Sequence, residues 1–77
     1  MDELEFVRNR RMNEHHYGDV KKACEKAGVT PPVFQNAIKK KRIDDLTSKE
    51  MSVVRAFITV LDERKEEKEF LKRSVFN

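Results

Sequence analysis

A chain of 77 residues accommodates one small domain and is too short for a deep catalytic cleft between two lobes. Charged residues make up 40% of the chain and it has one cysteine, so we expect a thin core, no internal disulfide and a reducing compartment. The sequence has neither an apolar leader nor a run of about 20 apolar residues that could span a bilayer. These features predict a cytoplasmic protein without a membrane partner.

The charge is segregated along the chain. Residues 20–42 contain seven basic residues and one acidic residue, a net charge of +6, whereas the rest of the chain sums to −3. A concentrated positive segment attracts polyanions because it neutralises phosphates and releases their counterions. A run of charge on its own is more often only a solvated helix face, so the neighbouring motifs must decide between the two interpretations.

Residues 3–14 carry an imperfect helical pattern of apolar side chains, formed by Leu4, Phe6, Val7 and Met12. We predict a helix here, and an extended segment is the alternative because Leu4 and Phe6 also fit a period of two. Tyr17 and Gly18 interrupt the pattern. The side chain of Asp19 is then suited to N-cap a second helix.

The second predicted helix runs from Asp19 to about Ala27. Its small apolar residues recur at helical spacing and form one narrow stripe, which consists of Val20, Ala23, Cys24 and Ala27. Such a stripe predicts a buried face that another helix can approach closely, with Cys24 as an unreactive core thiol. Gly28 follows, and glycine commonly ends a helix in the left-handed conformation.

A third helix restarts two residues later. Thr30 is a suitable N-cap, and Pro31 and Pro32 fit the first two helical positions, where an absent N–H costs nothing. Val29 and Phe34 have the spacing of a hydrophobic staple. Helical geometry places Phe34, Ala37 and Ile38 on the inner face. The opposite face is centred on Pro32, Asn36 and Lys39, flanked by Gln35 and Lys40.

A fourth helix is predicted from a capping box formed by Thr47 and Glu50, with Leu46 and Met51 as a second staple. Its expected core stripe consists of Met51, Val54, Phe57, Ile58 and Leu61. The segment 62–69 is charged at every position and either continues as an exposed helix or frays. Four apolar residues follow, which we expect to dock onto the body or onto a second subunit: Phe70, Leu71, Val75 and Phe76.

Residues 20–39, VKKACEKAGVTPPVFQNAIK, resemble the helix-turn-helix of lambda-repressor and Cro-like regulators. Cys24, Gly28 and Phe34 match the small apolar, turn and inward positions of that motif. The resemblance implies a small all-α, lambda-repressor-like domain of four to five helices over residues 1–77. The motif covers about 20–39, and a charged helical tail begins at about residue 62.

The resemblance also implies a DNA-binding site. The positions that face the bases in this family are occupied here by Thr30, Gln35, Asn36 and Lys39. Asn and Gln pair with adenine N6 and N7, Lys donates to guanine O6 and N7, and Val33 is a candidate for contact with a thymine methyl. The expected phosphate contacts are Lys21, Lys22, Lys40, Lys41 and Arg42, with Arg8, Arg10 and Arg11 as further candidates. The chain departs from the family at Pro31 and Pro32, which replace polar residues common at the start of such a helix.

Catalytic chemistry is not indicated, because the sequence has no glycine-rich phosphate loop and no spaced metal ligands. His15 and His16 are adjacent and would point about 100° apart on a helix. We therefore expect no enzyme, no cofactor and no small-molecule substrate. The predicted function is sequence-specific binding of double-stranded DNA, as a transcriptional regulator or an accessory protein that acts as a dimer. The alternative is a protein–protein adaptor that uses the same helical body and the C-terminal amphipathic segment.

Overall fold

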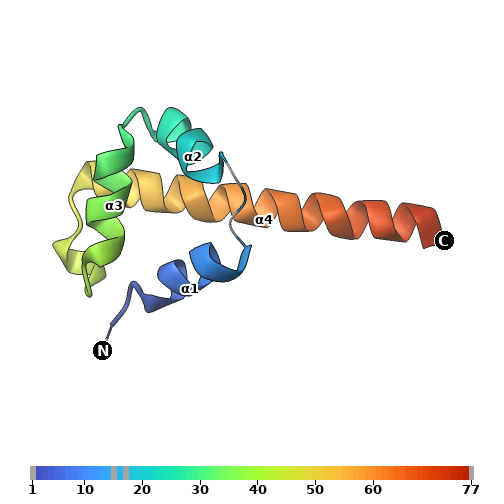
Figure 1. Cartoon of the computed structure of the whole chain (residues 1–77), viewed down its shortest axis with the longest axis horizontal. Helices are drawn as coiled ribbons and strands as arrows, with labels where there is room; N and C mark the ends of the chain where they lie inside the picture. The colour runs from blue at the N-terminus through green and yellow to red at the C-terminus, as the bar shows by residue number, and fades with distance from the viewer. Residues whose placement is uncertain (1, 15, 17, 77) are drawn as a thin grey trace.

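A computed structural model of the chain describes residues 2–14, 16 and 18–76. These residues form four α-helices, α1 (Glu5–Glu14), α2 (Asp19–Ala27), α3 (Pro31–Lys39) and α4 (Ser48–Phe76). A 3₁₀ turn, η1 (Ile43–Asp45), precedes α4, and the described residues contain no β-strand. The predicted all-α fold with four helices is confirmed (Figure 1).

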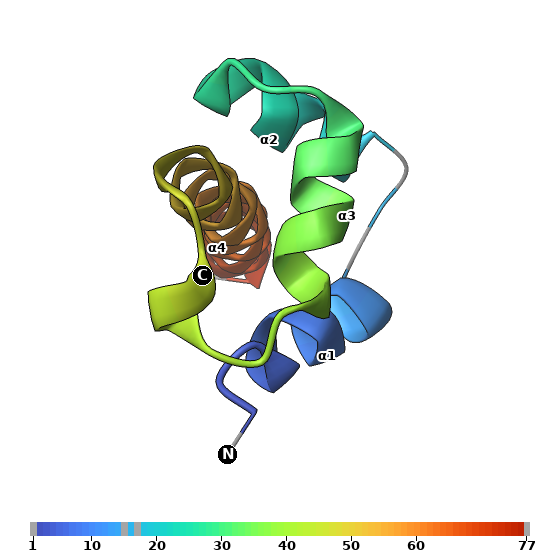
Figure 2. The ribbon, with the colours of Figure 1, turned by 90° about the vertical axis from the view of Figure 1, so that its left-hand side faces the viewer.

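The long helix α4 is the axis around which the other helices are arranged. Its N-terminal half packs against α2, α3 and α1, and its C-terminal half extends beyond them (Figure 1). Viewed along α4, α2 lies above it, α3 beside it and α1 below, near the C-terminal end of α3 (Figure 2). The longest dimension of the molecule, 46 Å, follows from this extension.

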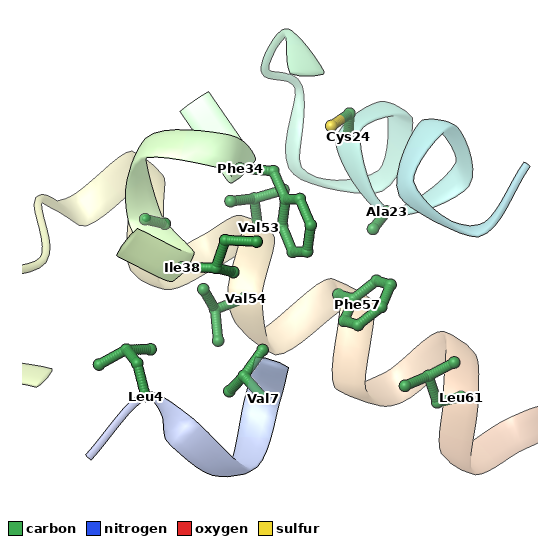
Figure 3. Close-up of a cluster of buried hydrophobic side chains, with 11 residues drawn as sticks. Leu4, Val7, Ala23, Cys24, Phe34, Ile38, Val53, Val54, Phe57 and Leu61 are labelled. Carbon is green, nitrogen blue, oxygen red and sulfur yellow. The ribbon is translucent and has the colours of Figure 1, made fainter. Parts of the chain in front are cut away.

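The core lies between all four helices (Figure 3). The rings of Phe34 from α3 and Phe57 from α4 meet at its centre, with 4.8 Å between ring centroids. The predicted stripe on α2 is confirmed, because Ala23 and Cys24 are buried and Val20 and Ala27 pack at the edge. The remaining buried members of the cluster are Leu4, Val7, Ala37, Ile38, Val53, Val54 and Leu61.

The prediction for the first segment is confirmed as a helix, although α1 begins at Glu5 and leaves Leu4 just before it. Leu4 is buried, and its N–H donates to Asp2 Oδ1 at 3.1 Å. Phe6 and Met12, which the pattern placed among the apolar residues of this helix, are exposed. The buried face of α1 is therefore narrower than the sequence suggested.

The predicted N-cap of α2 is wrong. Gly18 holds the capping position in a left-handed conformation (φ 89°), and Asp19 is the first residue of the helix. The Asp19 carboxylate is buried, where it accepts a hydrogen bond from the His16 N–H at 2.8 Å and pairs with Arg64 of α4. Arg64 also donates to the Glu14 carbonyl at 3.1 Å. The ion pair with a distant arginine explains why Asp19 points inward, and it attaches the α1–α2 connection to α4.

The predicted core stripe of α4 is only partly right. Val54, Phe57 and Leu61 are buried as expected, but Met51 is 43% exposed, whereas Val53 and Val60 are buried. Met51 lies about 120° around the helix from Phe57, so it cannot face the same neighbours. It lines an apolar surface groove instead, beside Phe6 and Ile43.

The charged segment after Leu61 continues as helix, and ion pairs join its first turn to the body. Asp62 pairs with Arg10 at 2.7 Å, Glu63 pairs with Lys26 at 3.6 Å, and Arg64 contacts Asp19. Farther along, Phe70, Leu71 and Val75 are exposed by 67%, 59% and 74%, so these three side chains do not dock onto the body. The side chain of Phe76 lies outside the described residues.

Cys24 is 3% exposed, and burial raises the pKa of its thiol. We predict that a thiol reagent labels the native protein far more slowly than the protein in denaturant, because the thiolate is the reactive form. Cys24→Asp should unfold the domain, since it places an unpaired carboxylate in the core, whereas Cys24→Ala should fold. Stopped-flow labelling and circular dichroism provide the measurements. Rapid labelling of the folded wild type would contradict this placement.

Candidate nucleic-acid interface

The turn between α2 and α3 has the geometry that its sequence predicts. Gly28 adopts a left-handed conformation (φ 69°), and its N–H donates to the carbonyls of Cys24 and Glu25. Thr30 is the N-cap of α3 with extended backbone and makes no side-chain capping bond, and Pro31 and Pro32 open the helix. Gly28 at the end of α2 and the two prolines at the start of α3 therefore fix the relative position of the two helices.

The inner face of α3 is held from two sides. Phe34, Ala37 and Ile38 are all buried, as predicted. On one side, Phe34 meets Phe57 of α4, and on the other the Arg11 guanidinium of α1 lies 5.5 Å from its ring centroid, within cation–π distance. These contacts set the rotation of α3 about its own axis.

With the inner face fixed, the opposite face of α3 is open to solvent. Asn36 and Lys39 are exposed on α3, and Thr30 is exposed just before its first turn. Gln35 is half-buried at the flank next to α1, where its Oε1 accepts a hydrogen bond from Arg11 Nη1 at 3.2 Å. The four predicted base-reading residues therefore divide into three exposed residues and one that is shared with α1.

The predicted phosphate contacts divide in the same way. Lys21 and Lys22 on α2 are exposed, as are Lys41 and Arg42 after α3. Lys40 is engaged within the protein, because its Nζ donates to Glu50 Oε1 at 2.6 Å and to the Asp45 carbonyl at 2.8 Å. The structure gives this lysine a role in joining the end of α3 to the start of α4.

Sequence reasoning missed Lys49. This exposed residue, together with Thr47 and Glu50, borders an open groove whose other wall is formed by Val33, Asn36 and Lys39 of α3. The capping box that places it is confirmed: Thr47 N–H donates to Glu50 Oε1 at 2.9 Å, and Glu50 N–H donates to Thr47 Oγ1 at 3.2 Å. The box indicates where the helix starts, but only the tertiary packing of α4 against α3 brings Lys49 beside Asn36.

The three arginines of α1, considered as further phosphate contacts, all have partners inside the molecule. Arg8 donates to the Ile38 carbonyl at 2.6 Å and to the Lys40 carbonyl at 3.3 Å, which satisfies the C-terminal end of α3. Arg10 bonds to Glu14, and this contact lowers the pKa of the Glu14 carboxyl. Arg11 is shared between Phe34 and Gln35. Arg8 and Arg11 therefore position α3, whereas Arg10 bonds within α1 and pairs with Asp62 of α4.

Metal and membrane sites are not found in the part of the chain that the structure describes. There, no three His, Cys, Asp or Glu residues are grouped so that they could hold a metal ion, and His15 lies outside these residues. Within the same residues, no helix combines the length and apolar character needed to cross a bilayer.

Comparison of the chain with protein-family models, with curated proteins and with solved structures finds no match. The resemblance of residues 20–39 to lambda-repressor and Cro-like regulators therefore stays a prediction, because no relative supports or contradicts it.

The Glu50 carboxylate is the buried anion of this region. The hydrogen bond from Lys40, and then those from Thr47, hold the pKa of Glu50 below its ordinary value of 4.5. A carboxyl with a lowered pKa stabilises the fold above its unfolded pKa, and that contribution is lost as the pH falls through the folded pKa.

We predict that Glu50→Gln lowers the free energy of unfolding by about 1 to 3 kcal/mol near neutral pH, because hydrogen bonds to a charged group are lost. The difference between variant and wild type should shrink as the pH falls below 4.5 and through the lowered pKa of the folded state, because the wild-type carboxyl then becomes neutral like the glutamine side chain. Urea unfolding across this pH range measures it, with Glu25→Gln, a change at an exposed side chain of α2, as the control. A pH-independent difference would show that the charge of Glu50 is not what stabilises the fold.

Proposed function

We propose that this chain binds double-stranded DNA in a sequence-specific manner, with α3 in the major groove, as a transcriptional regulator or an accessory DNA-binding protein. The observation that carries the proposal is the two-sided character of α3. One face is fixed in the core by Phe34, and the other presents Asn36 and Lys39 to solvent. The major groove admits an α-helix, and amide and ammonium groups pair with the edges of its bases.

The exposed groups suggest distinct roles. Asn36 would pair with adenine N6 and N7, and Lys39 would donate to guanine O6 and N7, with Thr30 and Gln35 at the margin of the same face. The expected phosphate contacts are exposed cations of α2, of the segment after α3 and of the start of α4: Lys21, Lys22, Lys41, Arg42 and Lys49. Lys40 would act indirectly, since its bonds to Glu50 and Asp45 hold the end of α3. A reducing cytoplasm would suit the free thiol of Cys24.

The test is a salt series on one duplex selected from a random pool and one random duplex. Asn36→Ala should cost about 1 to 3 kcal/mol on the selected duplex and narrow its advantage over random DNA. Gln35→Ala should act in the same direction. Lys41→Ala and Arg42→Ala should lower the affinity for both duplexes by the same factor. Each should also reduce the slope of log affinity against log salt by about one unit.

Lys72→Ala is the matched control, because it removes the same charge from the exposed tail, far from α3. It should leave affinity and salt dependence nearly unchanged. If Asn36→Ala and Gln35→Ala alter neither affinity nor sequence preference, α3 does not read DNA. A protein–protein adaptor would then be the better account of the fold.

A second candidate function rests on the exposed apolar residues of the tail. Phe70, Leu71 and Val75 lie on the part of α4 that extends beyond the body, and Leu71 and Val75 share one helix face. Exposed apolar residues clustered in this way mark interaction surfaces. We propose that a second copy packs here, as expected if two half-sites on DNA are bound. The adaptor alternative would place a partner helix on the same residues.

We predict a dimer in sedimentation experiments at high protein concentration. Leu71→Glu should shift the protein to monomer, because it places a charge in the apolar seam, and Glu69→Gln should not. The wild type should bind DNA with two half-sites cooperatively, whereas the Leu71→Glu variant should not. If the wild type stays monomeric and binds half-sites independently, the predicted dimer is wrong.

A further inference from the structure

The first turn of α3 lacks the hydrogen-bond donors that a helix start usually offers. Pro31 and Pro32 have no N–H, and the Val33 N–H donates to the Thr30 carbonyl at 3.0 Å. Free amides at a helix N-terminus ordinarily bind phosphates and other polar groups. The backbone at this end of α3 therefore offers few donors to phosphate or to polar base edges.

The same turn offers apolar surface. Pro32 is exposed on the outward face, one turn before Asn36, and Val33 is half-buried on the wall of the groove that Asn36 and Lys39 also line. Neighbours three and four positions apart lie on one side of a helix, so Pro32 and Val33 both adjoin Asn36. The proposed reading face thus combines an apolar patch with an amide directly beside it.

We propose that Pro32 and Val33 select thymine through its C5 methyl group, which would make this turn a specificity-determining part of α3 beside Asn36. The inference rests on the proposed function, because it applies only if α3 enters the major groove. There the thymine methyl is the apolar feature of the base edges, and cytosine lacks it. Asn36 beside the patch has the donor and acceptor that adenine requires, so the combination favours T·A-containing sites.

The test replaces thymine with uracil, which removes the methyl group and leaves every hydrogen-bonding group in place. In the duplex selected by the wild-type protein, each thymine is replaced in turn and the affinity is measured. At one or two positions the affinity should fall about fourfold. This factor corresponds to about 0.8 kcal/mol, the free energy of burying one methyl group. A thymine outside the protected region is the DNA control and should show no change.

Pro32→Ser and Pro31→Ser form a matched pair of protein variants. Both restore a backbone N–H and replace a ring with a hydroxymethyl group, but the two side chains point about 100° apart. Pro32→Ser should bring the thymine-to-uracil affinity ratio at the sensitive positions close to one. Pro31→Ser should leave the ratio near four.

Each other outcome overturns the inference. Equal affinity for thymine and uracil at every position, in a duplex that is still bound specifically, refutes methyl recognition and leaves the proposed function standing. An equal loss of discrimination in both serine variants assigns the effect to the helix start and not to Pro32. Absence of binding to any duplex refutes the proposed function and this inference together.

Discussion

The packing of Phe34 against Phe57 is the contact on which the candidate site depends. It joins the third helix to the long α4 at the centre of the core, and truncating a buried phenylalanine of this kind typically costs about 3 to 5 kcal/mol. Asn36 is two residues from Phe34, about 200° around the helix, so the side that faces solvent follows from the side that faces Phe57. A rotation of α3 that exposed Phe34 would turn Asn36 toward the core.

Polar contacts hold the C-terminal end of α3 in place. Arg8 holds the carbonyls of Ile38 and Lys40 at the C-terminal end of α3, and Lys40 reaches across to Glu50 at the start of α4. These cations are therefore used inside the molecule and have less charge to offer a polyanion. Lys39 and Lys49 stay exposed beside the groove at Asn36, and Lys41 and Arg42 stay exposed directly after α3.

The local signals in the sequence predicted the element boundaries well. Gly28, the two prolines and the Thr47–Glu50 capping box act within a few residues, and each stands where it was expected. The wrong N-cap at Asp19 involves a partner far along the chain. Asp19 is drawn inward by Arg64, 45 residues away, and this kind of pairing has no local signature.

The candidate site follows the same division. Helical periodicity predicted the exposure of Asn36 and Lys39, because it depends only on which face of α3 is apolar. It could not predict that Gln35 shares its amide with Arg11, that Lys40 is bound by Glu50, or that Lys49 borders the same groove. Those facts depend on how α1 and α4 cross α3, which a single sequence does not specify.

The most direct test of α3 as the reading helix is a nuclear magnetic resonance titration of the isotope-labelled protein with its selected duplex. If α3 reads the bases, the largest shifts fall on the side-chain amide of Asn36 and on the backbone amides of Thr30 and Lys39. The amides of Phe70, Leu71 and Val75 should then shift less than these. Shifts confined to the tail, or spread evenly over exposed lysines without an effect on Asn36, would contradict a reading role for α3.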